Sequence, residues 1–442
     1  MNRSLRRAAA FAAVATLVLA APLLGAATAA PFAVVAAAAL TVTDGWLFDV
    51  FSTPRDRREG RLRTLAGFAL AATGVGLLVP VFGVPVGVFV ATVLAVGYGD
   101  LGRRLVLQVR EDRAVSMAGF VAAGTVAALA GQAAAAALAG TAASEAVPYW
   151  VFVASSGALV AGVLRSVFVG RDDAVVVVTV ALLLWLLAVL APVESLSTAA
   201  AYERVFVALG VTTLFGYVSY ALDAGSVAGM LTGVLLGLFA VVLGGYGWYA
   251  VLLAFFIVGS LTTKFRYDRK LERGVAEENE GARGTGNVLG NSAAALVALL
   301  LYAAHAHVPL TAPAYQFAYA GAVATALADT LSSEVGGLFD GPRLITTFER
   351  VEPGTDGAVT WQGELAGLAG AALIAGLCVA VFGFGPVGAG VVVAAGFAGM
   401  TADSLAGAVL EGDVVGNQGV NFLATLTGGL AGGALALLGH VA

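Results

Sequence analysis

The sequence predicts an all-α protein, a polytopic bundle of membrane-spanning helices, and two observations carry this prediction. Of its 442 residues, 60% are hydrophobic and 12% are charged, whereas soluble domains carry about 25% charged residues. Uncharged apolar stretches repeatedly reach the ~20 residues that a helix needs to cross a hydrocarbon core about 30 Å thick. Their apolar residues are continuous and not alternating, which excludes a transmembrane β-barrel.

The apolar runs predict about fifteen transmembrane helices. In chain order they cover residues 8–28, 30–47, 64–81, 82–98, 117–140, 147–164, 174–191, 204–222, 224–243, 246–263, 288–306, 314–330, 363–383, 385–402 and 419–439. The first run follows arginines and ends near small residues, as a secretory signal does. Because a second apolar segment comes next, and no soluble domain, we interpret the first run as a retained helix.

Basic loops set the predicted orientation. Lys and Arg gather at residues 3–7, 55–63, 103–113, 165–171 and 264–283, and a further charged loop covers 340–364. The predicted helices place an even number of spans between each of these loops and the next, so all of them lie on one side of the membrane. Because loops rich in Lys and Arg stay in the cytoplasm, we expect a cytoplasmic N-terminus.

The chain is expected to form two membrane domains, residues 1–203 and 204–442. Asp44, Asp100 and Asp329 each end an inward-running helix, and each precedes a charged loop and a helix with a similar start. These starts read LAGFALA at 65–71, MAGFVAA at 117–123 and LAGLAGA at 365–371. The pattern indicates a degenerate internal repeat.

A first polar loop combines basic residues with glycine turns. It begins at Lys264 and leads through Arg283 into a helix that opens with Asn287 and Asn291. The two asparagines are four residues apart and therefore share one helix face. Glycine turns at a helix N-terminus beside an arginine can cradle an anion. For the cluster from Lys264 to Lys270 taken alone, a positive-inside anchor is the favoured alternative.

A second polar loop begins with Asp329, Ser333 and Glu334 at the end of an apolar run. Asp329 and Ser333 are four residues apart on a helix, and carboxylate and hydroxyl oxygens gathered in this way suit Mg²⁺. The alternative is a cap at the membrane interface with surface acids. Either way, the polar group lies at the predicted cytoplasmic end of its helix.

A third polar element repeats this arrangement near the C-terminus. Asp403 ends one helix, and Asn417 and Asn421 stand four residues apart at the start of the next. Carboxylates on helices that leave the membrane and asparagines on helices that enter it therefore gather on one side. Polar residues inside a helical bundle are costly unless they are functional or partnered, so we expect one assembled polar site.

Six polar stretches carry a resemblance to a known family. They are GSLTTKF at 259–265, EENEGARGTGNVLGN at 277–291, ADTLSSEVG at 328–336, PGTDGAVTWQG at 353–363, ADSLAGA at 402–408 and GNQGVNF at 416–422. Through them, residues 205–442 resemble the integral-membrane family that includes plant phytyl-phosphate kinase and animal transmembrane protein 19. The resemblance implies a kinase that transfers phosphate from a nucleotide, CTP in the plant relatives, to a prenyl monophosphate such as geranylgeranyl or phytyl phosphate.

Under this resemblance the polar residues take roles in phosphoryl transfer, which is mostly positioning plus neutralisation of phosphate charge. The expected catalytic residues are Asp329, Arg283 and Lys264, the two basic ones facing phosphate oxygens. The expected Mg²⁺ ligands are Asp329, Glu334 and Asp403. Contacts to the nucleotide or the acceptor are expected from Asn287, Asn291, Ser333, Gly354, Thr355, Gly357, Asn417 and Asn421.

The first half carries a fainter resemblance. The stretch VGYGDLGRRL at 96–105, followed by SMAGF at 116–120, is weakly similar to membrane prenol kinases such as phytol kinase and dolichol kinase. Those enzymes have a lysine directly before the serine, whereas Val115 stands before Ser116 here. The departure puts the catalytic activity of this half in doubt.

The alternative function is a transporter or lipid flippase without kinase activity, which the many helices, the repeat and the abundant glycine would suit. A transporter would place polar residues near the bilayer midplane, whereas these gather at one interface. The expected partners are a nucleoside triphosphate, a prenyl-phosphate lipid and the bilayer, with no nucleic acid. The expected location is the plasma membrane, with the site facing the cytoplasm.

Overall fold

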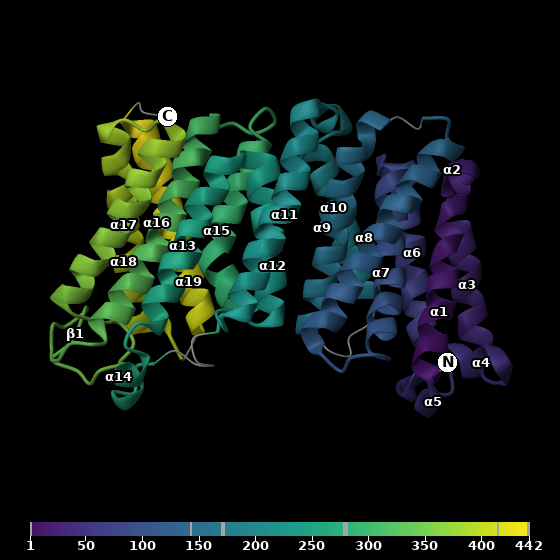
Figure 1. Ribbon diagram of the computed structural model, residues 1–442, viewed down its shortest axis with the longest axis horizontal. Helices are drawn as coiled ribbons and strands as arrows, with labels where there is room; N and C mark the ends of the chain where they lie inside the picture. Colours follow the sequence, from purple (N-terminus) through teal and green to yellow (C-terminus); the bar gives the residue numbers. More distant parts are fainter. Residues whose placement is uncertain (1, 142–143, 169–172, 277–281, 413–414, 440–442) are drawn as a thin grey trace. The chain divides into compact units, whose positions relative to one another are not determined.

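The structure confirms the all-α membrane bundle. The computed structural model describes residues 2–141, 144–168, 173–276, 282–412 and 415–439, and 80% of the chain is helical (Figure 1). Among the described residues, 13 helices are long and apolar enough to span a membrane, or 14 if one bent pair counts as a span. The predicted count of about fifteen is therefore close.

Two predicted spans account for the difference. Helix α16 (Ala312–Gly336) forms where it was expected, but its polar residues keep it out of the apolar set. The predicted span at 30–47 is instead two helices, α3 (Ala30–Thr41) and α4 (Gly45–Phe51), bent by 107° relative to each other. The break is next to Gly45, whose φ of 79° is a conformation that glycine adopts easily.

The chain divides into two units, Met1–Val207 and Ala208–Ala442. Besides α3 and α4, the first unit contains α1 (Arg3–Ala15), η1 (Thr16–Ala20), α2 (Ala21–Leu24), η2 (Gly25–Ala27), α5 (Pro54–Glu59), α6 (Arg63–Phe82), α7 (Val86–Val106), α8 (Arg113–Leu138), η3 (Ser144–Ala146), α9 (Val147–Val167), α10 (Asp173–Leu190) and η4 (Val193–Leu196). Helix α11 (Ala199–Ala221) crosses the boundary. The assignment of the two halves to different functions stays a prediction.

The second unit is built around α16. Its other elements are α12 (Val227–Phe239), η5 (Ala240–Gly244), α13 (Tyr246–Lys264), α14 (Tyr267–Glu272), α15 (Thr285–Ala303), β1 (Arg343–Leu344), β2 (Ala358–Val359), α17 (Trp361–Phe382), α18 (Pro386–Leu410) and α19 (Asn417–Leu438). Helix α16 contacts α13, α15, α17, α18 and α19. The two short strands pair antiparallel in the connection between α16 and α17.

Helix boundaries follow from capping residues in the sequence. The side chain of Asp112 accepts a hydrogen bond from the Val115 amide at 2.9 Å and starts α8. Thr360 starts α17 in the same way, with the Gly363 amide at 3.1 Å. Gly83, with a φ of 70°, ends α6 in the left-handed conformation that favours glycine.

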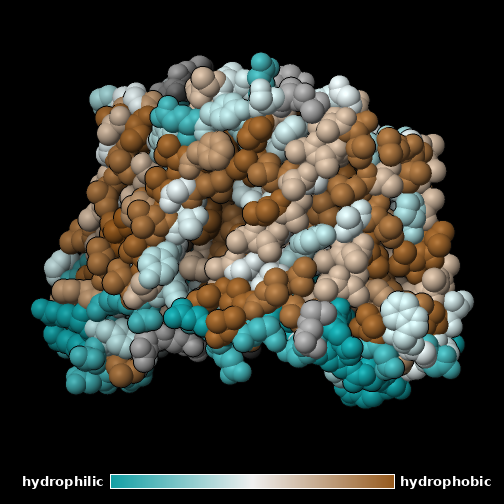
Figure 2. All heavy atoms as spheres, turned by 45° about the vertical axis from the view of Figure 1, so that its right-hand side comes forward, coloured by the Kyte–Doolittle hydropathy of each residue, from teal (hydrophilic) through white to brown (hydrophobic). Residues whose placement is uncertain are grey.

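The surface of the helices matches a lipid environment. Figure 2 shows hydrophobic residues over the sides of the helices and hydrophilic residues gathered at their ends. On α6, for example, the exposed side chains include Leu70, Leu77 and Val81. A bilayer would cover this apolar surface, while the charged connections stay in water.

Small residues let the helices of the first unit approach closely. A Cβ atom at Gly102 on α7 would lie 2.5 Å from the carbonyl oxygen of Gly119 on α8. A Cβ atom at Gly97 would lie 2.6 Å from the Cβ of Ala15, so α1 also packs tightly against α7. This is the backbone-close packing typical of membrane helices.

The same principle organises the second unit around a buried hydroxyl. Thr325, in α16, donates a hydrogen bond to the Gly321 carbonyl at 2.9 Å. A Cβ atom would lie 2.2 Å from the Thr325 Oγ1 if placed at Gly399 on α18, and 1.9 Å from it if placed at Gly428 on α19. Three helices therefore meet at this threonine with no room for larger side chains.

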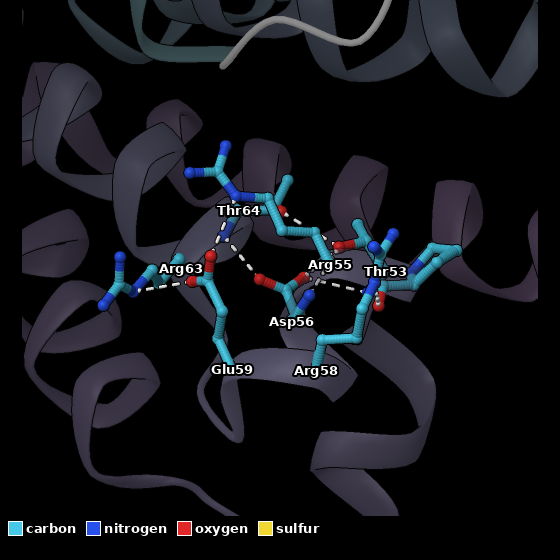
Figure 3. A network of polar contacts seen from close by, with 8 residues as sticks. Thr53, Arg55, Asp56, Arg58, Glu59, Arg63 and Thr64 are labelled. Atoms are coloured by element: carbon cyan, nitrogen blue, oxygen red, sulfur yellow. Dashed lines mark hydrogen bonds and ion pairs between the residues drawn. The ribbon is translucent and has the colours of Figure 1, made fainter.

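One buried carboxylate holds the segment between α4 and α6. Asp56 is 0% exposed. It accepts hydrogen bonds from the amide and hydroxyl of Thr53 at 2.8 and 2.7 Å and from the Thr64 amide at 3.1 Å (Figure 3). Burial alone would raise the pKa of Asp56, but the hydrogen bonds from Thr53 and Thr64 outweigh it and hold the pKa below its ordinary value.

We expect Asp56→Ala to lower the free energy of unfolding by about 1–3 kcal/mol, because the Thr53 and Thr64 donors lose a buried acceptor. The folded-state pKa is lowered, so the contribution of Asp56 is present above the ordinary carboxyl pKa and is lost as the pH falls through the lowered one. Thermal unfolding of the detergent-solubilised protein at neutral and acidic pH measures both effects.

Glu59→Ala is the matched control for this change. Glu59 forms its ion pairs with Arg55 and Arg63, at 3.1 and 2.9 Å, on the exposed side of the same segment (Figure 3). Such exposed pairs contribute only about 0.2–1 kcal/mol. Equal losses for the two variants, or a loss at Asp56 that does not shrink in acid, would contradict the role given to Asp56.

Candidate functional site

The second unit contains a cavity of about 660 Å³ at one end of its bundle, the end at which α14 and β1 lie (Figure 1). The C-terminal ends of α13, α16 and α18 and the N-terminal ends of α15 and α19 build its wall. Every predicted site residue except Lys264 lines this cavity. They are Arg283, Asn287, Asn291, Asp329, Ser333, Glu334, Gly354, Thr355, Gly357, Asp403, Asn417 and Asn421.

The structure places Lys264 away from the cavity. Lys264 is exposed, and its ammonium donates to the backbone carbonyl of Leu222. Lys270, which the sequence suggested as a membrane anchor, is 1% exposed instead. The chain turns between them at Arg266, in the left-handed conformation with a φ of 51°, and this turn directs α14 back against the bundle. The geometry therefore gives no support to a phosphate-binding role for Lys264.

Lys270 and Glu334 form a buried ion pair beside the cavity. The Lys270 ammonium donates to the Glu334 carboxylate and to the carbonyls of Thr262 and Thr263, the latter two at 2.8 and 3.0 Å. The Glu334 side chain is 6% exposed in this pair. Glu334, predicted as a Mg²⁺ ligand, is therefore the counter-ion of a buried lysine.

Arg283 is held by its backbone and by an aromatic ring. Its amide donates to the Ala224 carbonyl and its own carbonyl accepts from the Ser226 amide, both at 3.1 Å. Its guanidinium lies over the ring of Phe255, 4.9 Å from the centroid, a cation–π contact. Gly259 leaves room for this group, because a Cβ atom at that position would lie 2.6 Å from a terminal nitrogen of Arg283. The cavity wall therefore carries a well-positioned positive charge.

The four asparagines come from two helices in close contact. On α15 the Asn291 amide donates to the Asn287 carbonyl at 3.1 Å, and on α19 the Asn421 amide donates to the Asn417 side-chain oxygen at 2.9 Å. The Asn287 side-chain oxygen is buried and has no hydrogen-bond partner within the described residues. These amides offer both donors and acceptors to a polar ligand.

The carboxyl groups of Asp329 and Asp403 lie within hydrogen-bonding reach of each other at the cavity. The Asp403 Oδ1 atom is buried and has no hydrogen-bond partner among the described residues. Two carboxylates this close repel one another unless a proton or a cation lies between them. Ser333, one turn beyond Asp329, donates to the Asp329 carbonyl at 3.0 Å and adds a hydroxyl oxygen to the same wall.

The donor set fits Mg²⁺ only in part. Within the described residues, no three His, Cys, Asp or Glu side chains come together as a metal-binding group. Of the predicted trio, Glu334 pairs with Lys270, and Asp329 and Asp403 are the two carboxylates that lie together. Two carboxylates are nevertheless a normal protein contribution for Mg²⁺, which usually keeps waters and takes further oxygens from substrate phosphates.

The connection that contains β1 and β2 rests against α18. Gly357 has a φ of 75°, and a Cβ atom there would lie 2.5 Å from the Ser404 carbonyl oxygen. Its carbonyl accepts from the Ile345 amide at 3.0 Å. Thr355 donates its hydroxyl to the Glu352 carbonyl at 2.7 Å. The predicted turn therefore forms one wall of the cavity, close to Asp403.

Glu411 and Gln418 also line the cavity but were not singled out from the sequence. Glu411 follows α18 and lines the cavity, and burial, then the negative charges of Asp356 and Asp403, raise its pKa. Gln418 lies three residues before Asn421 and therefore on the same helix face. That spacing could have identified Gln418, whereas no sequence pattern placed Glu411 beside Asp403.

Comparisons with known proteins match the second unit to a family. The model of the family described as integral membrane protein DUF92 matches residues 210–429, all within the second unit. An uncharacterized membrane protein of Methanocaldococcus jannaschii, MJ0933, is 38% identical over 194 residues, which cover 42% of this chain and 76% of that protein. The chain belongs to the DUF92 family. The resemblance noted for the second half of the sequence is therefore confirmed.

Two plant relatives extend the DUF92 comparison. Protein VTE6, chloroplastic, of Arabidopsis thaliana is 33% identical over 144 residues, 32% of this chain and 43% of that protein. Protein PGR of the same plant is 29% identical over 269 residues, 50% of this chain and 93% of that protein. No solved structure matches the chain.

We expect Gly290→Ala to separate α15 from α19. A Cβ atom at Gly290 would lie 2.8 Å from the backbone carbonyl oxygen of Gln418, which cannot move without shifting its helix. Overpacking of this kind costs about 1–3 kcal/mol, so the thermal unfolding temperature should fall. Gly376→Ala is the control, because a Cβ there meets nothing within 4 Å and alanine favours a helix. A neutral Gly290→Ala would refute this close approach.

We also expect Glu334→Gln to act on stability and not on metal binding. Removing one partner of a buried ion pair leaves the other charge uncompensated and costs about 3–5 kcal/mol, so the unfolding temperature should fall sharply. The Mg²⁺ dissociation constant, measured by titration of the purified protein, should change less than it does in Asp403→Asn. A larger loss of Mg²⁺ affinity in Glu334→Gln would restore Glu334 as a ligand.

Proposed function

We propose that this DUF92 protein is a membrane lipid phosphotransferase that transfers a phosphate from a nucleotide, CTP first among the candidates, to a prenyl monophosphate such as geranylgeranyl or phytyl phosphate. One observation carries the proposal. A single polar cavity at helix ends brings together two adjacent aspartates, a fixed arginine and a set of asparagines. The similarity to plant VTE6 supports the same class of function.

The cavity supplies the groups that phosphoryl transfer requires, namely positive charge and oriented donors around phosphate oxygens. Arg283 lines the cavity, and a guanidinium carries planar N–H groups suited to phosphate. The first amides of α15 follow the glycine turn at Gly284, and a helix N-terminus favours an anion. Asp329 and Asp403 would hold Mg²⁺, which when bound would neutralise charge on the nucleotide phosphates.

The transfer balances without an added base. An oxygen of the acceptor phosphate forms a bond to the terminal phosphorus of the nucleotide, and the bond from that phosphorus to the bridging oxygen breaks. The products are a prenyl diphosphate and a nucleoside diphosphate. Because the acceptor oxygen is already anionic at neutral pH, the residues need only hold the two phosphates in line and screen their repulsion.

The position of the cavity suits an amphiphilic acceptor. Its wall consists of helix ends, where the membrane meets water, and the same helices expose apolar side chains such as Val297, Phe397 and Leu430. The prenyl chain can stay in the bilayer while its phosphate enters the cavity. With the cavity facing the cytoplasm of a plasma-membrane protein, the nucleotide would reach it from the side where it is made.

The alternative of a transporter has less support. A structure with Asp329 and Asp403 beside a central cavity, far from Arg283, would favour it. Instead, all three line the same cavity, and the helix segments that contribute to it are terminal. A transporter built from discontinuous helices would bind its substrate near the midplane.

The assay uses purified full-length protein with Mg²⁺, CTP and geranylgeranyl phosphate, and follows the diphosphate by chromatography. We expect turnover in the wild type and a loss of more than about a hundredfold in Asp403→Asn and Asp329→Ala, as for removal of a group that stabilises transition-state charge. Asp268→Ala is the control, because this exposed aspartate on α14 is not part of the cavity wall.

Substrate scope decides the outcome. Failure to form a diphosphate with CTP, UTP or ATP and with either geranylgeranyl or phytyl phosphate would remove the kinase proposal. Turnover that survives in both aspartate variants would move the reaction to a different site. Uptake of a labelled prenyl phosphate into proteoliposomes without turnover would favour the transporter.

A further inference from the structure

A cluster of arginines lies at one end of the first unit and has no part in the proposed function. Each comes from a helix end. Arg7 lies near the start of α1, Arg103 and Arg104 lie in the last turn of α7, Arg113 begins α8, and Arg165 lies in the last turn of α9. Because α1, α8 and α9 all pack against α7, these ends meet at one place, here called the arginine cluster.

Specific interactions show how close these side chains are. Arg113 donates to the Ser166 carbonyl at 3.0 Å, next to Arg165 on α9. Arg103 is within electrostatic range of Arg104 and Arg113, and Arg165 is within range of Arg103 and Arg104. Arg7 lies near enough to Arg104 to repel it. Like charges at this spacing raise the free energy of the unit unless an anion lies among them.

Nearby acids only partly balance this charge. Asp100 is 3.8 Å from Arg104 and within electrostatic range of Arg7, Arg103 and Arg165, so one carboxylate serves four arginines. Asp173 pairs with Arg165. Asp56, within range of Arg7, already accepts the hydrogen bonds of Thr53 and Thr64. Among the described residues, Arg7 and Arg103 therefore lack a direct acidic partner of their own.

The guanidinium groups also hold unused donors. The Nε atoms of Arg103, Arg104 and Arg165 are buried and have no hydrogen-bond partner within the described part of the chain. A buried donor without a partner costs about 1–3 kcal/mol. Three such donors in one place, from two helices, indicate that a ligand normally supplies the acceptors.

A positive-inside anchor does not explain this arrangement. Anchoring arginines need only reach water, as Arg58 and Arg61 do on the exposed surface of the neighbouring segment. The side chains of Arg104 and Arg165 are instead only 28% and 18% exposed. Partial burial of several like charges is unfavourable in a membrane protein unless they are compensated.

We propose that the arginine cluster binds a phosphate or diphosphate group at the membrane interface. Guanidinium forks match phosphate oxygens in geometry and form charge-assisted hydrogen bonds with them. The location at helix ends is where the headgroups of anionic lipids lie. The group can belong to a lipid headgroup or to a phosphate-bearing solute, since both present the same oxygens. The site is independent of the cavity in the second unit.

A titration and a thermal unfolding experiment separate these sources. Inorganic pyrophosphate is titrated into the purified full-length protein in detergent, with calorimetric detection. In parallel, the unfolding temperature is measured in nanodiscs of phosphatidylcholine with and without phosphatidic acid. Both use an Arg283→Gln background, which removes the arginine of the second-unit cavity. If that background does not fold, the wild-type stoichiometry serves, with two pyrophosphates per chain expected and one after loss of the cluster.

Arg103→Gln/Arg104→Gln is the test variant, and Arg58→Gln/Arg61→Gln is the control with the same change in charge. We expect pyrophosphate binding to weaken by at least about tenfold in the test variant only, since two charge-assisted contacts are lost. Arg103→Lys/Arg104→Lys should recover part of the affinity. Binding in the pyrophosphate arm alone identifies a solute, and stabilisation by phosphatidic acid alone identifies a lipid.

Two results would overturn the proposal. Absence of saturable binding in both arms would show that the cluster takes no phosphate group. Equal weakening in the test and control variants would show that only the diffuse charge of this end attracts anions.

Discussion

The second unit depends on the close packing of three helices around Thr325. Its hydroxyl occupies the space that Gly399 on α18 and Gly428 on α19 leave open. One turn further along each helix, four residues after Thr325 and Gly399, stand Asp329 and Asp403. The two carboxyl groups are therefore close because α16 and α18 already approach closely one turn earlier. A side chain at Gly399 would push α16 and α18 apart and separate the two acids at the cavity.

At the cavity end of the second unit, the position of each charged group follows from the partner that it contacts. Lys270 is satisfied by Glu334 and by two carbonyls at the end of α13, so it ties α14 to the bundle and does not face the cavity. Among the described residues that line the cavity, Arg283 is the basic one. Its location over Phe255 and beside Gly259 keeps that charge in place. The cavity therefore combines a fixed cation with two neighbouring acids.

The two units treat the same physical constraint in opposite ways. In both, charges gather where helices leave the membrane, because they are costly inside it. In the second unit the excess at the cavity is acidic, and it suits a metal ion that carries phosphates. In the first unit the excess is basic, with buried donors on Arg103, Arg104 and Arg165, and it suits the phosphate itself. In each unit the excess charge favours binding of an oppositely charged ligand, because the membrane interior supplies no counter-ion.

The sequence by itself determined the spans and grouped polar residues that the structure brings to one cavity. Continuous apolar runs determine where helices cross a bilayer. The polar residues at the cytoplasmic ends of these helices lie on the same side of the membrane, so Asp329, Asp403 and Arg283 could be grouped without a structure. The tertiary structure decided which charge faces the cavity and which is consumed by packing. It placed Lys270 inside and Lys264 outside, gave Glu334 to the lysine, and brought Glu411 to Asp403. These outcomes depend on how short connections turn back onto the bundle, and that is settled by contacts between residues far apart in the chain.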